Sequence, residues 1–113
     1  LSVVGKYAET ILSDFSCSKL FIGVDGIDLD FGITTTNMME ASLNRIMINT
    51  AQKTIVLADS SKFGRRGFSK IAEMEDVDHI ITDSGIQPST ASRIEEMGIE
   101  LTIANPNPYN VKP

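Results

Sequence analysis

Residues 19–28 read KLFIGVDGID, an almost unbroken apolar run that ends in an acidic turn containing a glycine. A strand that is apolar on both sides is typical of a parallel sheet whose two faces are covered. The run therefore predicts a strand over residues 19–24, with Asp25 directly after its carboxyl end. Gly26 would let a ligand approach the backbone of the turn closely.

Strands and helices alternate along the rest of the chain. Apolar periodicity and helix-boundary residues predict strands over residues 19–24, 54–58, 79–82 and 99–103, and helices over residues 3–15, 37–51 and 88–97. Residues 32–37 are interpreted as a hydroxyl-rich loop, and residues 68–74 as a short helical turn. This order predicts an α/β fold in which a mostly parallel, Rossmann-like sheet carries helices on both faces.

Length and composition fit one domain, residues 1–104, followed by an irregular tail at residues 105–113. The net charge of −5 and the pI near 4.7 argue against direct nucleic-acid binding, which needs a basic face. The single cysteine, Cys17, excludes an internal disulfide, and no apolar run approaches the ~20 residues of a membrane span. A cytoplasmic protein without a membrane partner is expected. The chain begins at Leu1 rather than at Met, as a piece of a longer protein would.

Aspartates follow three of the predicted strands, at Asp25, Asp59 and Asp83. In an open parallel sheet, ligands bind in the crevice outside the carboxyl ends of the strands. These side chains, with Asp28 and Lys62 beside them, therefore predict a polar binding site along this edge. The alternative is structural, because short polar residues after strands also begin turns and cap helices.

Two further charged residues near this edge have two interpretations each. Asn37 and Glu40 have the spacing of a helix capping box, but Glu40 could also accept a hydrogen bond from a sugar hydroxyl or act as a general base. Lys62 is either a solvated lysine or a contact for a phosphate or carboxylate. The neighbouring Arg65 and Arg66 are interpreted as surface charges. No metal-ligand set or cofactor motif is recognised, so no cofactor is expected.

Several ordered motifs carry a family resemblance. They lie at residues 19–28, 32–35, 40–41, 56–64 and 80–83. Together they resemble the C-terminal sensor domain of DeoR-family bacterial transcriptional regulators, over nearly the whole chain. The resemblance implies the fold of glucosamine-6-phosphate deaminase, ribose-5-phosphate isomerase and CoA transferase-like proteins, and specifically its C-terminal half. It also implies a homo-oligomeric repressor of carbohydrate metabolism that binds a phosphorylated sugar or related metabolite.

The resemblance further implies that part of the regulator lies outside this chain. Operator DNA would be bound only through an N-terminal helix-turn-helix domain that is missing here, and the front half of the sensor, with its phosphate-binding loop, has no counterpart. The turn from Asp25 to Asp28 is similar to the Asp-Gly-Ala-Asp turn of the isomerase, and Glu40 falls at the place of its general base. Residues 32–37 depart from the isomerase because they contain no lysine. That loss suits recognition of a sugar phosphate without turnover.

An effector-sensing, non-enzymatic domain is therefore the principal expectation. Its predicted effector-binding residues are Asp25, Gly26, Asp28, Thr34, Thr35, Glu40 and Lys62, with no catalytic or metal-binding residues. One alternative is a fragment of a sugar-phosphate isomerase or deaminase that uses Glu40 as its base. Another is an oligomerisation module that has lost its ligand site with the missing half.

Overall fold

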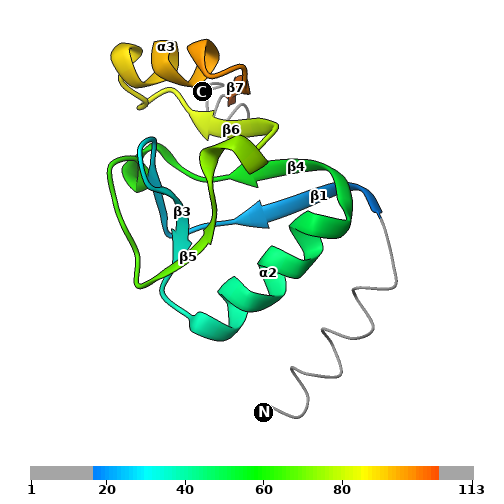
Figure 1. The fold of residues 1–113 in the computed structure, drawn as a ribbon. Coiled ribbons are helices and arrows are strands. Elements are labelled where there is room, and N and C mark those ends of the chain that lie inside the picture. The colour runs from blue at the N-terminus through cyan, green and yellow to red at the C-terminus, as the bar shows by residue number, and fades with distance from the viewer. Residues whose placement is uncertain (1–16, 105–113) are drawn as a thin grey trace, which may run out of the picture.

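The computed structural model describes residues 17–104, which form two sheets and two α-helices (Figure 1). The helix predicted over residues 3–15 and the tail at residues 105–113 lie outside the described residues. Of the two described α-helices, neither is long and apolar enough to cross a membrane.

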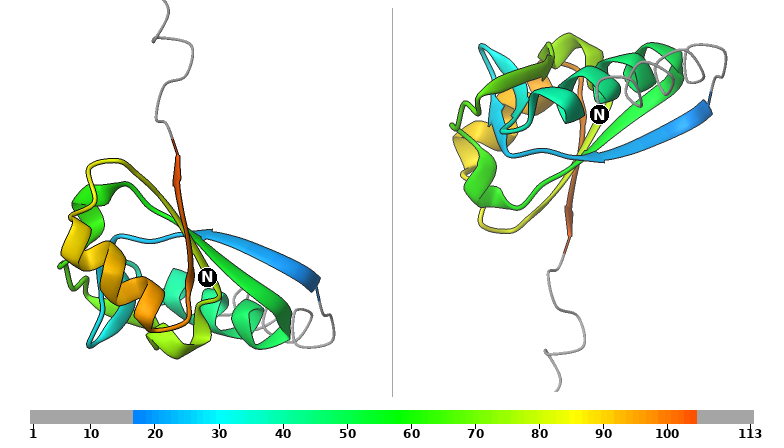
Figure 2. Two further views of the ribbon diagram at one scale, coloured as in Figure 1. Left: turned by 90° about the horizontal axis from the view of Figure 1, so that it is seen from above. Right: turned by 90° about the horizontal axis from the view of Figure 1, so that it is seen from below.

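The larger sheet has four strands that are all parallel. In spatial order they are β1 (Cys17–Gly23), β4 (Ala51–Leu57), β6 (His79–Asp83) and β7 (Glu100–Ala104). Each predicted strand is present within three residues of its predicted start. The mostly parallel α/β fold is thus confirmed, and Figure 2 shows how strongly the sheet twists from β1 to β7.

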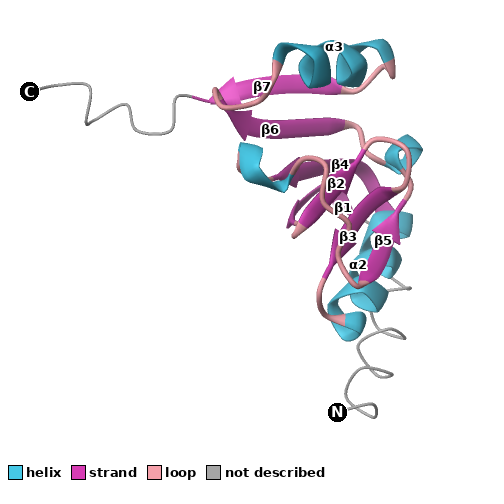
Figure 3. Cartoon of the chain, turned by 90° about the vertical axis from the view of Figure 1, so that its left-hand side faces the viewer, coloured by secondary structure: helices cyan, strands magenta, loops and turns pink. Residues whose placement is uncertain are grey.

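Two α-helices connect these strands. Helix α2 (Met38–Thr50) packs against β1 and β4, and helix α3 (Pro88–Glu96) packs against β7 (Figure 3). The side-chain oxygen of Asn37 accepts hydrogen bonds from the amides of Met39 and Glu40, so α2 begins at the predicted cap. Gly98 ends the α3 segment with a φ of +82°, a conformation that glycine adopts without strain.

The smaller sheet is antiparallel and corrects two predictions. It contains β2 (Gly26–Asp28), β3 (Gly32–Thr35) and β5 (Ser69–Ala72). Most of the predicted hydroxyl-rich loop is therefore strand β3, and the predicted helical turn over residues 68–74 is wrong. Both segments are too short to display a period, and pairing between residues more than thirty positions apart, such as Thr34 with Lys70, fixes them as strands.

One apolar core joins the two sheets. Ile22, Val56 and Ile80 lie in register across the larger sheet and are buried, as are Ile33 and Ile71 of the smaller sheet. Burying such a side chain stabilises the fold by about 1.5–3 kcal/mol. By contrast, Phe21 and Leu57 are 56% and 42% exposed, so the elements within residues 17–104 leave part of the sheet uncovered. The core thus holds the carboxyl ends of the strands against the small sheet, where the polar residues gather.

Candidate functional site

Two hollows lie beside the loops that follow the strands. The first, which we call the Lys62 hollow, has a volume of about 270 Å³ and is lined by Asp25, Thr36, Lys62, Arg65, Arg66 and Gly67. The second, the Arg93 hollow, has a volume of about 390 Å³. Its polar lining side chains are Asp28, Asp30, Ser60, Gln87, Thr90 and Arg93. Both lie where an open parallel sheet is expected to bind ligands.

Asp25 is held in the Lys62 hollow by residues of β3 and the segment after it. Its Oδ2 accepts hydrogen bonds from the Thr36 amide at 3.0 Å, the Thr35 hydroxyl at 3.0 Å and the Thr36 hydroxyl at 3.3 Å. The Thr36 amide, then the Thr35 hydroxyl, lowers the pKa of Asp25 below its ordinary value. The carboxylate is therefore ionised and oriented at neutral pH.

The cations of this hollow belong to the loop after β4, which is held in place by hydrogen bonds. The Asp59 carboxylate accepts hydrogen bonds from the amide and hydroxyl of Ser61, and Lys62 Nζ lies 3.7 Å from Asp59 Oδ2. The Gly64 amide then donates to the Ile27 carbonyl at 2.8 Å, which ties the loop to β2. For Asp59 the capping interpretation is thus correct, and the cap places Lys62 at the hollow.

Thr34 and Gly26 contact the part of this loop that carries Arg65 and Arg66. The fully buried Thr34 Oγ1 accepts a hydrogen bond from the Gly67 amide at 2.6 Å and donates to the Gly26 carbonyl at 3.4 Å. A Cβ at position 26 would lie 2.5 Å from the Arg65 carbonyl oxygen. Both residues therefore set where Arg65 and Arg66 stand, and the Thr34 hydroxyl is already used within the protein.

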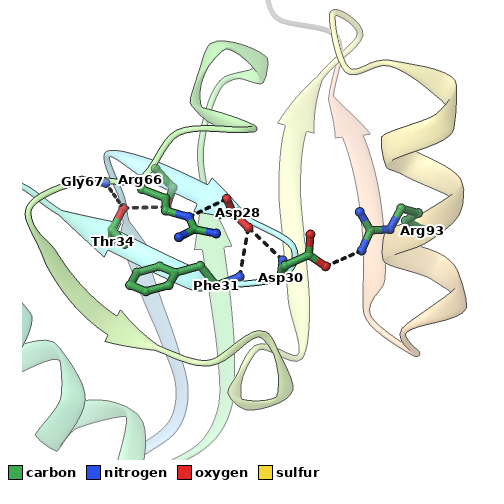
Figure 4. Close-up of polar contacts among 8 residues, drawn as sticks. Asp28, Asp30, Phe31, Thr34, Arg66, Gly67 and Arg93 are labelled. Carbon is green, nitrogen blue, oxygen red and sulfur yellow. Dashed lines mark hydrogen bonds and ion pairs between the residues drawn. The ribbon is translucent and has the colours of Figure 1, made fainter.

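An ion pair forms the wall between the two hollows. Arg66 Nε lies 2.9 Å from Asp28 Oδ2, and the guanidinium stands 4.6 Å from the centre of the Phe31 ring (Figure 4). Asp28 Oδ1 accepts hydrogen bonds from the amides of Asp30 and Phe31, each at 2.9 Å. Arg66 contributes most to lowering the pKa of Asp28, and the Asp30 amide adds to it. The Asp28 carboxylate thus fixes the turn after β2 and also pairs with Arg66.

The Arg93 hollow brings α3 close to the same turn. Arg93 Nη2 lies 3.0 Å from Asp30 Oδ1, a contact between residues 63 positions apart. At the other side, Asp83 accepts hydrogen bonds from the amides of Ser60 and Gly85 at 2.9 and 2.8 Å. The Ser60 amide is the main cause of the lowered pKa of Asp83. Asp83 therefore organises loops, as its structural interpretation predicts.

The structure brings together only some of the predicted site residues. Asp25 and Lys62 line one hollow, Asp28 lines the other, and Thr35 supports Asp25. Glu40 is exposed in the first turn of α2 and lines neither hollow, so its predicted ligand contact stays a prediction.

Sequence reasoning missed three arginines. Arg65 and Arg66, interpreted as surface charges, line the Lys62 hollow, and Arg93 lines the other. The sequence did contain a signal for Arg65 and Arg66, because both lie within four positions of Lys62 in the same glycine-containing loop. No signal marked Arg93, because its position depends on how α3 packs. Among residues 17–104, no group of His, Cys, Asp and Glu side chains is arranged to hold a metal ion.

Acid should destabilise this edge of the molecule. Asp25, Asp28, Asp59 and Asp83 all have a pKa below the ordinary value of 3.8, because amides, hydroxyls or Arg66 bond to their ionised forms. Their stabilising contribution is complete above the unfolded-state pKa and is lost as the pH falls through the folded-state pKa. We expect the free energy of unfolding, measured with urea, to be level above about pH 5 and to decline below about pH 4. A free energy of unfolding that stays as high below about pH 4 as it is above about pH 5 would contradict the assignment, and Asp28→Asn should reduce the decline.

The molecule is thus an α/β domain with two polar hollows at the edge where its parallel strands end. Residues 1–84 match the family model described as the DeoR C terminal sensor domain, and the chain belongs to this family. It is 38% identical to the uncharacterized HTH-type transcriptional regulator YulB of Bacillus subtilis, over 90% of this chain and 40% of that protein. It is 40% identical to a putative aga operon transcriptional repressor of Escherichia coli O157:H7, over 90% of this chain and 38% of that protein. The HTH-type transcriptional regulator GlpR of Haloferax volcanii is 35% identical, over 88% of this chain and 39% of that protein. The chain thus spans about two fifths of the length of these relatives.

Proposed function

We propose that this chain is the effector-sensing part of a DeoR-family transcriptional repressor, and that its effector is a phosphorylated sugar or a related metabolite. Operator DNA would be bound by a helix-turn-helix domain elsewhere in the complete regulator. The names of the relatives, which are transcriptional regulators and repressors, support this class of function. A regulator of this class works in the cytoplasm, where the chromosome lies.

The charge of the Lys62 hollow carries the proposal. Three cationic side chains, Lys62, Arg65 and Arg66, share its lining with one carboxylate, Asp25. Lys62 and Arg66 pair with Asp59 and Asp28, whose side chains lie outside this lining, and Arg65 has no ion pair within residues 17–104. The three cations favour an anionic group, for which lysine and arginine are the usual protein ligands. The ionised Asp25 favours a neighbouring group that donates hydrogen bonds, such as a sugar hydroxyl. A phosphate joined to a polyhydroxylated carbon chain satisfies both requirements.

The predicted site residues then divide into two roles. Asp25, Asp28 and Lys62 would contact the effector, while Gly26, Thr34 and Thr35 would act by holding the contacting groups in place. Glu40 would contact the effector only if the first turn of α2 approached it. We propose no turnover, because the general base of the alternative enzyme would be Glu40, which lines neither hollow.

Effector binding would act on the complete regulator by changing the populations of its states. A ligand shifts such an equilibrium only by its difference in affinity between two states. The proposed homo-oligomer would supply these states as alternative arrangements of its subunits.

Titration of the chain with sugar phosphates tests the site. We expect saturable backbone amide shifts at residues 25–36 and 60–67 when triose, pentose and hexose phosphates are added. Lys62→Met should weaken binding by about 10-fold or more, because a charge-assisted contact is lost. Lys53→Met is the matched control, since Lys53 pairs with Glu100 at 3.5 Å near the other end of β4. Equal affinities for the two variants would refute the assignment of Lys62.

A further inference from the structure

Of the side chains that line the Arg93 hollow, the proposed function uses only Asp28, although this hollow is the larger of the two. We propose that it is the subsite for the hydroxyl-bearing carbon chain of the effector, and that Thr90 and Arg93 of α3 determine which chain length is accepted. This inference rests on the proposed function, because it needs an anionic group in the Lys62 hollow.

The two hollows differ in the chemistry of their linings. The charged side chains that line the Arg93 hollow are two carboxylates, Asp28 and Asp30, and one guanidinium, Arg93, whereas three cations and one carboxylate line the Lys62 hollow. The remaining polar lining side chains are the neutral hydroxyls of Ser60 and Thr90 and the amide of Gln87. A lining with one cation and several neutral donors and acceptors suits a polyhydroxylated group, whereas the lining of the Lys62 hollow, with three cations, suits an anion.

The hollows are close enough for one ligand to occupy both. Asp28 lines the Arg93 hollow and Arg66 lines the Lys62 hollow, and their side chains are in contact at 2.9 Å. Figure 4 shows Arg66, Asp28, Asp30 and Arg93 as a row of contacting residues that runs toward α3. A ligand whose anionic end lies beside Arg66 would therefore extend along Asp28 into the second hollow.

The lining of the Arg93 hollow can also accommodate a carbon chain. Its half-buried apolar lining residues, Leu29 and Phe63, can contact the C–H face of a sugar. The side chains of Arg93 and Asp30 are 52% and 76% exposed, and an ion pair this exposed contributes little to stability. The guanidinium can thus exchange part of its contact with Asp30 for a ligand hydroxyl at small cost. Thr90, three residues before Arg93 on α3, lies on the same helix face.

Calorimetry on the 113-residue chain separates the two subsites. The probes are inorganic phosphate, glycerol 3-phosphate, ribose 5-phosphate and glucose 6-phosphate. Thr90→Val keeps the shape of the side chain and removes its hydroxyl, and Arg93→Met removes the guanidinium. We expect each variant to weaken the best-bound sugar phosphate by about three- to tenfold and to leave the affinity for inorganic phosphate unchanged. Ser89→Ala, an exposed neighbour on α3 outside the hollow lining, is the matched control.

The possible outcomes separate this inference from the proposed function. If Lys62→Met weakens all four probes while Thr90→Val and Arg93→Met weaken none, the second subsite is overturned and the proposed function stands. If the α3 variants weaken inorganic phosphate as much as sugar phosphates, the division of labour between the hollows is wrong. If the unmodified chain binds none of the probes, both proposals fail. Circular dichroism of each variant shows whether a loss of affinity reflects unfolding.

Discussion

Gly32→Ala should destabilise the domain by about 2–4 kcal/mol, because it combines backbone strain with a steric clash. Gly32 has a φ of +127°, which side-chain-bearing residues rarely adopt. An added Cβ would also lie 2.2 Å from the backbone carbonyl oxygen of Ala72 in the paired strand β5. Since that oxygen belongs to the strand backbone, β3 and β5 would have to separate. Equilibrium unfolding in urea measures the change.

Gly64→Ala separates the two causes. Gly64 also has a positive φ, +83°, but a Cβ there would meet no heavy atom within 4 Å. We expect it to cost only about 1 kcal/mol, the usual penalty for a left-handed residue with a side chain. If the two variants were equally stable, the close approach of β3 to β5 would not be a constraint on the fold.

Asp25→Asn should weaken the binding of a sugar phosphate by about 10- to 100-fold, since hydrogen bonds to a charged acceptor are lost. The amide keeps an oxygen that can accept the hydrogen bond from the Thr36 amide, so the variant should stay folded, although it loses the stabilisation that the ionised carboxylate supplies. Inorganic phosphate should bind at least as tightly as before, because the variant removes the only carboxylate lining the Lys62 hollow in the described part of the chain. Titration of the chain with both probes measures the contrast.

Asp76→Asn provides the same change of charge away from both hollows. The Asp76 carboxylate also accepts a backbone hydrogen bond, from the Glu73 amide at 3.2 Å. Its substitution should leave both affinities unchanged. In a complete regulator, Asp25→Asn should give a repressor that still binds its operator but no longer responds to the sugar phosphate. Normal induction of that variant would remove Asp25 from the site.

The alternation of strands and helices could be predicted because each element carries a local signal. The apolar run at residues 19–24, the Asn37 cap and the proline at position 88 each mark an element without reference to the rest of the chain. The small antiparallel sheet could not be predicted in this way. Its strands have three or four residues each and are defined by partners far away in the sequence, such as Thr35 and Ser69.

The amino-acid sequence by itself determined the α/β class, the edge of the sheet that would carry the polar residues, and the prediction that Asp25 and Lys62 belong there. Those conclusions follow from local periodicity and from the rule that parallel strands end at a common edge. Only the tertiary structure decided that Arg65 and Arg66 line a hollow and that Arg93 lies beside Asp30. It also decided that Thr34 is buried, where its hydroxyl accepts a hydrogen bond from the Gly67 amide. The physical reason is that burial and charge pairing depend on three-dimensional distance. Residues 63 positions apart meet here because β2 and α3 pack on one core, and no local pattern encodes that contact.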